Sequence, residues 1–185
     1  PKPTAPKPTA PIPTAPKPTA PKPNKDGFTP IRINAGSEVG AITTIDGVVW
    51  KSDKILPYKI VGKSKAFDKP CGAGAEHGQD LLLCSERWFL GTGGYEIPVP
   101  PGTYTVKLHF AELFHDKIGD RVFHIDIEGQ ILRRSYDILK MAKSANVLVT
   151  ETFQNIEVQD GQDLTIEFES IKGKDHAKVS AVEIL

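Results

Sequence analysis

The first 23 residues repeat a five-residue unit, Pro-Lys-Pro-Thr-Ala, with one isoleucine in place of a lysine and a truncated last copy. Ten of the chain's 16 prolines lie in this segment. Each proline fixes its own φ, lacks a backbone N–H donor and pushes the preceding residue toward extended backbone. The segment therefore cannot form a helix or join a sheet. We expect a polyproline II rod of roughly 70 Å, at ~3.1 Å per residue.

Two interpretations of this repeat stay open. It is either a spacer between domains or a glycosylated stalk, because Pro-flanked threonines recur every five residues in the manner of mucin-like segments. A turn cluster, Asn-Lys-Asp-Gly, ends the repeat at residue 27. The sequence thus predicts a linker or stalk at 1–27 and a folded domain at 28–185. The candidate O-glycosylation sites are Thr4, Thr9, Thr14 and Thr19.

Beyond residue 27 the apolar residues recur with a period of two, which is typical of half-buried strands. The clearest alternating runs are 104–110, 123–128 and 164–169, and turn residues follow or precede them at 100–102, 128–129 and 160–161. We therefore expect an all-β domain, an antiparallel β-sandwich of the jelly-roll kind. One short helical turn is expected at 137–143, with Asp137 as its N-cap.

The charge and the cysteines limit the function classes. The chain has a formal net charge of 0 at pH 7, and it contains no run of about 18 apolar residues, so neither nucleic-acid binding nor membrane insertion is expected.

The spacing of Cys71 and Cys84 does not match a zinc site. The two cysteines form either a disulfide or two buried thiols. The Pro/Thr-rich repeat favours an exported chain, and hence the disulfide and an extracellular or cell-surface location.

No catalytic motif was found. Nucleophile-elbow, P-loop, dinucleotide-binding and zinc-protease patterns are absent from the sequence. We expect Gly91–Gly94 to form a turn, and we expect Glu86, Glu96 and Glu112 to form salt bridges rather than a glycosidase pair. His109 and Glu112 should face opposite sides of one strand. The sequence therefore predicts a non-enzyme without a transition metal or cofactor; carboxylates alone leave a structural calcium open.

Nine short motifs resemble the malectin domain family, which is named for an endoplasmic-reticulum lectin and also occurs as carbohydrate-binding modules and in receptor ectodomains. The motifs occur in family order over residues 30–185. The resemblance implies a malectin-type β-sandwich whose loops hold a sugar cleft. The motifs are RINAG (32–36), DGVVW (46–50) with Asp53, SERW (85–88), PVPPGTY (98–104), LHFAE (108–112), GDRVF (119–123), EG (128–129), DI (137–138) and VSAVEIL (179–185).

The resemblance also implies which residues contact sugar. In the family, aromatic rings stack on sugar faces and a carboxylate bonds hydroxyl groups. The family's animal lectin carries tyrosines at most of these positions, whereas this chain lacks their phenolic groups, so the same sugar specificity does not carry over. The positions that match are Phe67 (with Tyr58 as the alternative), Trp88, Phe114, His115 and Asp175.

Other residues of the motifs are expected to be structural. Trp50 should pack in the core, and of the neighbours Trp88 and Phe89 one ring should face inward and the other outward. We expect an internal ion pair between Arg87 and either Glu112 or Asp46. Asn34 should likewise form internal polar bonds.

The sequence is consistent with two functions. The first is a non-catalytic carbohydrate-binding module, tethered by its Pro/Thr segment and binding a glycan or polysaccharide. The second is a structural or adhesive extracellular protein whose glycosylated repeat forms a rod and whose sandwich contacts matrix or cell-wall proteins.

Overall fold

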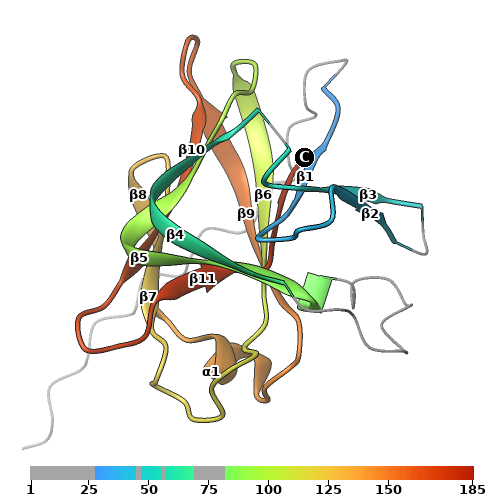
Figure 1. Cartoon of the computed structure of the whole chain (residues 1–185). Helices are drawn as coiled ribbons and strands as arrows, with labels where there is room; N and C mark the ends of the chain where they lie inside the picture. Colours follow the sequence, from blue (N-terminus) through green and yellow to red (C-terminus); the bar gives the residue numbers. More distant parts are fainter. Residues whose placement is uncertain (1–27, 45–46, 56, 69–81) are drawn as a thin grey trace, which may run out of the picture.

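The computed structural model describes residues 28–44, 47–55, 57–68 and 82–185. The repeat with its four threonines, Asp46 and Cys71 lie outside these residues, so the stalk, its glycosylation and the Cys71–Cys84 disulfide stay predictions. The described chain is almost entirely β, with two six-stranded sheets and one short helix. No helix among the described residues has the length and apolar composition needed to span a bilayer. The predicted β-sandwich is confirmed (Figure 1).

The first sheet contains both ends of the domain. Its order is β2-β3-β1-β12-β6-β9. The pairs are antiparallel except β1 with β3, which is parallel and departs from the purely antiparallel sandwich expected from the sequence. The strands are β1 (Ile31–Asn34), β2 (Ala41–Thr43), β3 (Val49–Ser52), β6 (Gly102–Phe110), β9 (Val149–Val158) and β12 (Ala181–Ile184).

The second sheet is built around one long strand, β5. Its order is β11-β5-β10-β7-β8, and β4 pairs with the other edge of β5. Helix α1 (Ile138–Ala142) follows β8, and Asp137 caps it by accepting a hydrogen bond from the backbone N–H of Lys140, as the sequence predicted. The strands are β4 (Lys59–Asp68), β5 (Ser85–Ile97), β7 (Phe123–Ile127), β8 (Gln130–Tyr136), β10 (Leu164–Ser170) and β11 (Ala177–Val179).

The core lies between the two sheets and contains the residues that alternation placed inward. Tyr104, Val106, Leu108 and Phe110 of β6 are all buried, as are the apolar residues of β7 and β10. Phe89 of β5 is fully buried and stacks on Phe168 at 5.5 Å between ring centroids.

A second, smaller cluster of buried residues contains Trp50, Leu82 and Ala181. Trp50 is therefore a core residue, as expected. Its ring contacts the imidazole of His109 edge to face at 5.4 Å between centroids. His109 is 1% exposed, and burial lowers its pKa to about 4, because the charge of Glu183 offsets only part of the desolvation.

The turn predicted at Gly91–Gly94 is wrong, because β5 continues through these glycines. A Cβ atom at Gly94 would overlap the backbone of Ile166 in β10, and one at Gly93 would overlap the backbone of Val61 in β4. The glycines therefore let strands approach β5 closely from both sides. β5 therefore continues through these glycines and does not end at them.

Candidate functional site

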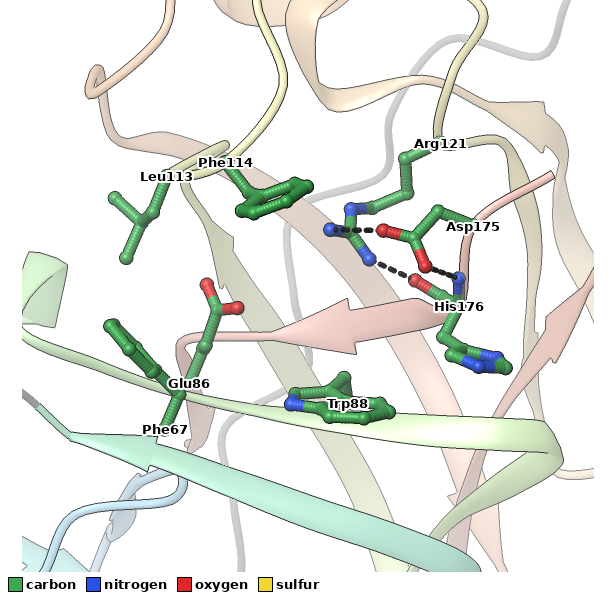
Figure 2. Close-up of a pocket in the computed structure, with 8 residues that line it drawn as sticks. All are labelled: Phe67, Glu86, Trp88, Leu113, Phe114, Arg121, Asp175 and His176. Atoms are coloured by element: carbon green, nitrogen blue, oxygen red, sulfur yellow. Dashed lines mark hydrogen bonds and ion pairs between the residues drawn. The ribbon is translucent and has the colours of Figure 1, made fainter.

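One pocket of about 420 Å³ opens over the first half of β5. Loop 111–122, which joins β6 to β7, forms one wall, and loop 171–176, which joins β10 to β11, forms another (Figure 2). Its volume falls within the range of small-molecule sites. The lining residues are Phe67, Glu86, Trp88, Leu113, Phe114, Arg121, Asp175 and His176.

The floor of the pocket follows from the alternation of β5. Arg87 and Phe89 are buried on the inner side of the strand, so Glu86 and Trp88 face the pocket. Phe67 of β4 lies directly opposite Glu86 in the register, and directly opposed residues share a face of the sheet. The expectation that Trp88 and Phe89 face opposite ways is thereby confirmed.

Aromatic rings stand on opposite sides of the pocket. Phe114, on loop 111–122, is 81% exposed, and Phe67, on β4, is 44% exposed. Trp88 is partly buried and stacks on His176, with centroids 5.3 Å apart and planes at 14°. Figure 2 shows Phe114 across the pocket from Phe67 and Trp88. A flat apolar ligand could contact rings on both sides.

Loop 111–122 is held in place by Glu112, which is 1% exposed. Its Oε1 accepts hydrogen bonds from the backbone N–H groups of Phe114 (3.1 Å) and His115 (3.2 Å). Its Oε2 accepts one from Nε of Arg121 at 2.7 Å. Burial alone would raise the pKa of Glu112, but Lys178 and Arg121 lower it below its ordinary value. An ionised, fully bonded carboxylate thus positions the Phe114 ring.

Asp175 lies on the opposite wall and is fixed by three partners. Nη2 of Arg121 lies 2.9 Å and Nε2 of His115 2.7 Å from its Oδ2, and the backbone N–H of His176 donates to Oδ1 at 2.7 Å. Burial raises the pKa of Asp175, but the bonds from His115 and His176 and the charge of Arg121 outweigh it, so the pKa is lowered. The pocket therefore presents an ionised carboxylate, an acceptor for hydroxyl groups.

A buried lysine lies under the floor. Lys178 of β11 is 0% exposed and its Nζ forms an ion pair with Oε2 of Glu86. Nζ also lies 3.9 Å from Oε1 of Glu112. Full burial lowers the pKa of Lys178, and the two carboxylates offset part of that shift. One cation thus links the pocket floor to the residue that holds loop 111–122.

The inner side of β5 carries a separate ion pair, which corrects the expected partner of Arg87. Its Nε and Nη2 donate to Asp53 at 2.6 and 2.8 Å, rather than to Glu112; the other expected partner, Asp46, lies outside the described residues. Asp53 also accepts from the hydroxyl of Tyr95 and from the backbone N–H of Gly36. The sequence carries no local signal for this pairing, because Asp53 lies 34 residues from Arg87 and is not part of an alternating run.

The predictions for Asn34 and for the three glutamates are confirmed. Asn34 is buried and accepts a hydrogen bond from Ser85 at 2.9 Å. The three glutamates considered for a glycosidase pair all form salt bridges: Glu86 with Lys178, Glu96 with Lys59, and Glu112 with Arg121. Within the described ranges, no group of three or more histidine, cysteine, aspartate or glutamate side chains is placed to hold a metal ion.

Four of the five residues expected to contact sugar line one pocket: Phe67, Trp88, Phe114 and Asp175. His115 is not among the lining residues, but its Nε2 lies 2.7 Å from Oδ2 of Asp175 and so helps to position that carboxylate. The alternative to Phe67, Tyr58, packs against the core, where burial raises its pKa to about 12. The sequence analysis did not assign Glu86, Leu113, Arg121 or His176 to the pocket, although each adjoins or lies close to a residue that it did assign.

Comparison with known families gives a match over nearly the whole described region. The family described as "Malectin domain" matches residues 29–182. Human malectin is 27% identical over 108 residues, which are 57% of this chain and 36% of that protein. A probable leucine-rich-repeat receptor-like serine/threonine kinase of Arabidopsis thaliana is 32% identical over 74 residues, 37% of this chain and 8% of the kinase. The chain thus spans well under half of these curated relatives.

Solved structures show the same fold. The plant receptor-like kinase FER superposes with a TM-score of 0.69 at 20% identity, covering 85% of this chain and 42% of that one. A β-glucuronidase of Bacteroides uniformis superposes with a TM-score of 0.66 at 17% identity, covering 84% of this chain and 18% of the enzyme. At these identities the likeness concerns the fold alone.

Proposed function

The chain belongs to the malectin domain family, and from this premise we propose that residues 28–185 are a non-catalytic carbohydrate-binding module. In this proposal a glycan enters the pocket over β5, stacks on Trp88 and Phe114, and hydrogen-bonds to Asp175. The observation that carries the proposal is the convergence of three aromatic rings and an ionised carboxylate on one pocket of about 420 Å³.

The chemistry of the pocket matches that of a sugar. A pyranose presents C–H groups on its face, which pack on flat aromatic rings, and hydroxyl groups at its edge, which need polar partners. Trp88 and Phe114 supply the apolar surface, and Asp175 supplies an acceptor. Because the aromatic side chains that line the pocket carry no phenolic hydroxyl, the polar contacts must come from the carboxylates, the indole N–H and the ring of His176.

The acidic groups at the pocket are better suited to binding than to hydrolysis. A glycosidase needs a carboxylic acid with a raised pKa. The pKa of Asp175 is lowered, and Glu112 is shielded from the pocket and bonded to Arg121, Phe114 and His115. The superposed β-glucuronidase shares only its fold over 18% of its length, and this likeness gives no reason to propose hydrolysis here.

We place the module in an extracellular or cell-surface protein, with residues 1–27 as its linker or stalk. The Pro/Thr repeat of the sequence supports this location. A solved relative of the fold is the extracellular domain of ANXUR2 from Arabidopsis thaliana. The disulfide between Cys71 and Cys84 belongs to the same proposal.

A glycan array followed by calorimetry tests the proposed function. Gluco-, galacto- and manno-oligosaccharides are titrated into the wild-type chain and into Trp88→Ala, with Leu90→Ala as the matched control. Leu90 lies two residues further along β5, is 37% exposed and does not line the pocket. We expect Trp88→Ala to lose binding and Leu90→Ala to keep it. Absence of binding to every sugar class, or equal binding by both variants, would refute the proposal.

A further inference from the structure

Glu86 is the most buried acid that lines the pocket, and the proposed function names Asp175, but not Glu86, as the partner of a particular sugar hydroxyl. We propose that its carboxylate is the specificity-determining acceptor of the site, bonding hydroxyl groups of a neutral hexopyranose that stacks on Trp88. On this basis the site selects neutral sugars over sugars that carry a carboxylate. The inference rests on the proposed function and adds the ligand class to it.

The first observation is an unfilled hydrogen-bonding position. The Glu86 side chain is 9% exposed, and its Oε2 pairs with Lys178. Among the described residues no donor contacts its Oε1. Figure 2 shows the carboxylate directed from β5 into the space between Phe67, Trp88 and Phe114. This oxygen is open to the pocket rather than enclosed by protein, so a ligand hydroxyl can reach it and donate a hydrogen bond.

The second observation is the position of Glu86 relative to the rings. Glu86 and Trp88 lie two residues apart on one face of β5, which is about 7 Å along a strand. Phe67 lies directly opposite Glu86 on β4. A pyranose that stacks its face on Trp88 would therefore direct its edge, where the equatorial hydroxyls lie, toward Glu86. Each carboxylate oxygen can accept two hydrogen bonds, so Oε2 can also receive a hydroxyl beside Lys178.

The third observation is the distribution of charge. Arg121 lines the pocket, but its Nε donates to Glu112, its Nη1 to the carbonyl of His176, and its Nη2 pairs with Asp175. Lys178 is enclosed between Glu86 and Glu112. The pocket wall thus presents carboxylates whose cations are already engaged. A uronic acid would bring a third carboxylate close to two others, which is unfavourable at low dielectric.

One cation lies at the rim rather than the floor. Nζ of Lys65, directly opposite Trp88 on β4, is 5.3 Å from the centroid of the Trp88 ring. In the part of the chain that the structure describes, Lys65 forms no ion pair. It is the residue through which an acidic sugar could still bind, so the experiment includes it.

The test compares a neutral sugar with its acidic counterpart. Galactobiose and digalacturonate, together with the neutral oligosaccharide that the array ranks first, are titrated into the wild type, Glu86→Gln and Glu96→Gln. Glu96 is the matched control, because it lies on the same strand, pairs with exposed Lys59 at 2.7 Å and is remote from this pocket. We expect Glu86→Gln to bind neutral sugar about tenfold more weakly, as for loss of one bond to a charged group. The ratio of its affinity for the neutral sugar to its affinity for digalacturonate should also decrease.

Two results would overturn the inference while leaving the module intact. The first is loss of binding in Trp88→Ala with unchanged binding in Glu86→Gln. The second is tighter binding of digalacturonate than of galactobiose by the wild type, with loss of that preference in Lys65→Gln. Absence of binding by the wild type would refute the proposed function itself, and this inference with it.

A measurement on the wild type covers the case in which Glu86→Gln does not fold. The side-chain carboxyl carbon of Glu86 is observed by carbon-13 NMR as the neutral sugar is added. A shift that saturates with the calorimetric affinity supports direct contact. If the Glu86 resonance does not change while the Trp88 signals shift, the sugar does not contact Glu86 and the inference is wrong.

Discussion

Glu86 and Arg87 are neighbours on β5, and both form buried ion pairs, but the two pairs face opposite sides of the strand. On the inner side, Asp53 accepts four hydrogen bonds, from Gly36, Tyr95 and two nitrogens of Arg87. On the pocket side, Glu86 has one partner, Lys178, and one oxygen that no described donor contacts. The bonds of Asp53 all come from the protein, whereas Glu86 keeps an oxygen open to the pocket. This difference is the reason for proposing Glu86, and not Asp53, as a ligand-binding acid.

The substitution Asp53→Asn tests the inner ion pair and should have the largest effect on stability. It removes the charge that Arg87 and Tyr95 face in a buried setting, where loss of one partner costs about 3–5 kcal/mol. We expect urea unfolding to show a loss of that size, while the protein that remains folded binds sugar with unchanged affinity. A loss below about 1 kcal/mol would show that the inner pair is dispensable.

Acid should destabilise the domain first through His109, because Glu112 and Asp175, whose pKa values are lowered, lose their contribution to stability only at lower pH. The pKa of His109 falls from 6.5 in the unfolded chain to about 4 in the folded one. The unfolded chain therefore binds more protons between these values, so stability is full above pH 6.5 and falls as the pH drops toward 4. We expect up to about 3 kcal/mol from this group.

Urea unfolding at pH 7, 5 and 4 measures this loss in the wild type and in His109→Gln. The variant keeps a polar side chain near Thr150 but does not titrate. Its stability should decline less steeply with acid. If the stability of both proteins falls equally with decreasing pH, titration of other groups causes the loss of stability.

Glu112→Gln tests whether loop 111–122 depends on one carboxylate. The change weakens the bonds to Arg121, Phe114 and His115 in a buried site, for which we expect a loss of about 2 kcal/mol in stability. Hydrogen exchange of the Phe114 and His115 amides should accelerate more than that of β10. Equal acceleration throughout the chain would indicate global destabilisation instead of release of the loop.

The smallest effect on stability is expected for Phe114→Ala. The ring is 81% exposed, so the free energy of unfolding should change by no more than about 0.5 kcal/mol. Sugar affinity should fall about tenfold if the ring stacks on the ligand, as for an aromatic contact of about 1.5 kcal/mol. Ile118→Ala is the control, because Ile118 lies on the same loop, is 60% exposed and does not line the pocket. Equal affinities for the two variants would remove Phe114 from the site.

Sequence reasoning succeeded where the determining interaction is local. Alternation in 104–110, 123–127 and 164–168 placed the buried faces of β6, β7 and β10, and the Asp137 cap follows from its position before an apolar turn. It failed at Gly91–Gly94, where a local preference for turns was overridden by strands on both sides that need the space a side chain would fill. His115 was matched to a sugar-contacting position, but it does not line the pocket and instead bonds Asp175.

The sequence by itself determined the strands, the inward faces and the family, because a period of two and ordered motifs can be recognised along the chain. Tertiary structure alone decided which charges meet. Lys178 and Glu86 are 92 residues apart, and they meet because β11 pairs with β5. Long-range pairing of this kind depends on the topology of the sheet, which no local pattern encodes. The same topology leaves one oxygen of Glu86 without a donor at the centre of the pocket.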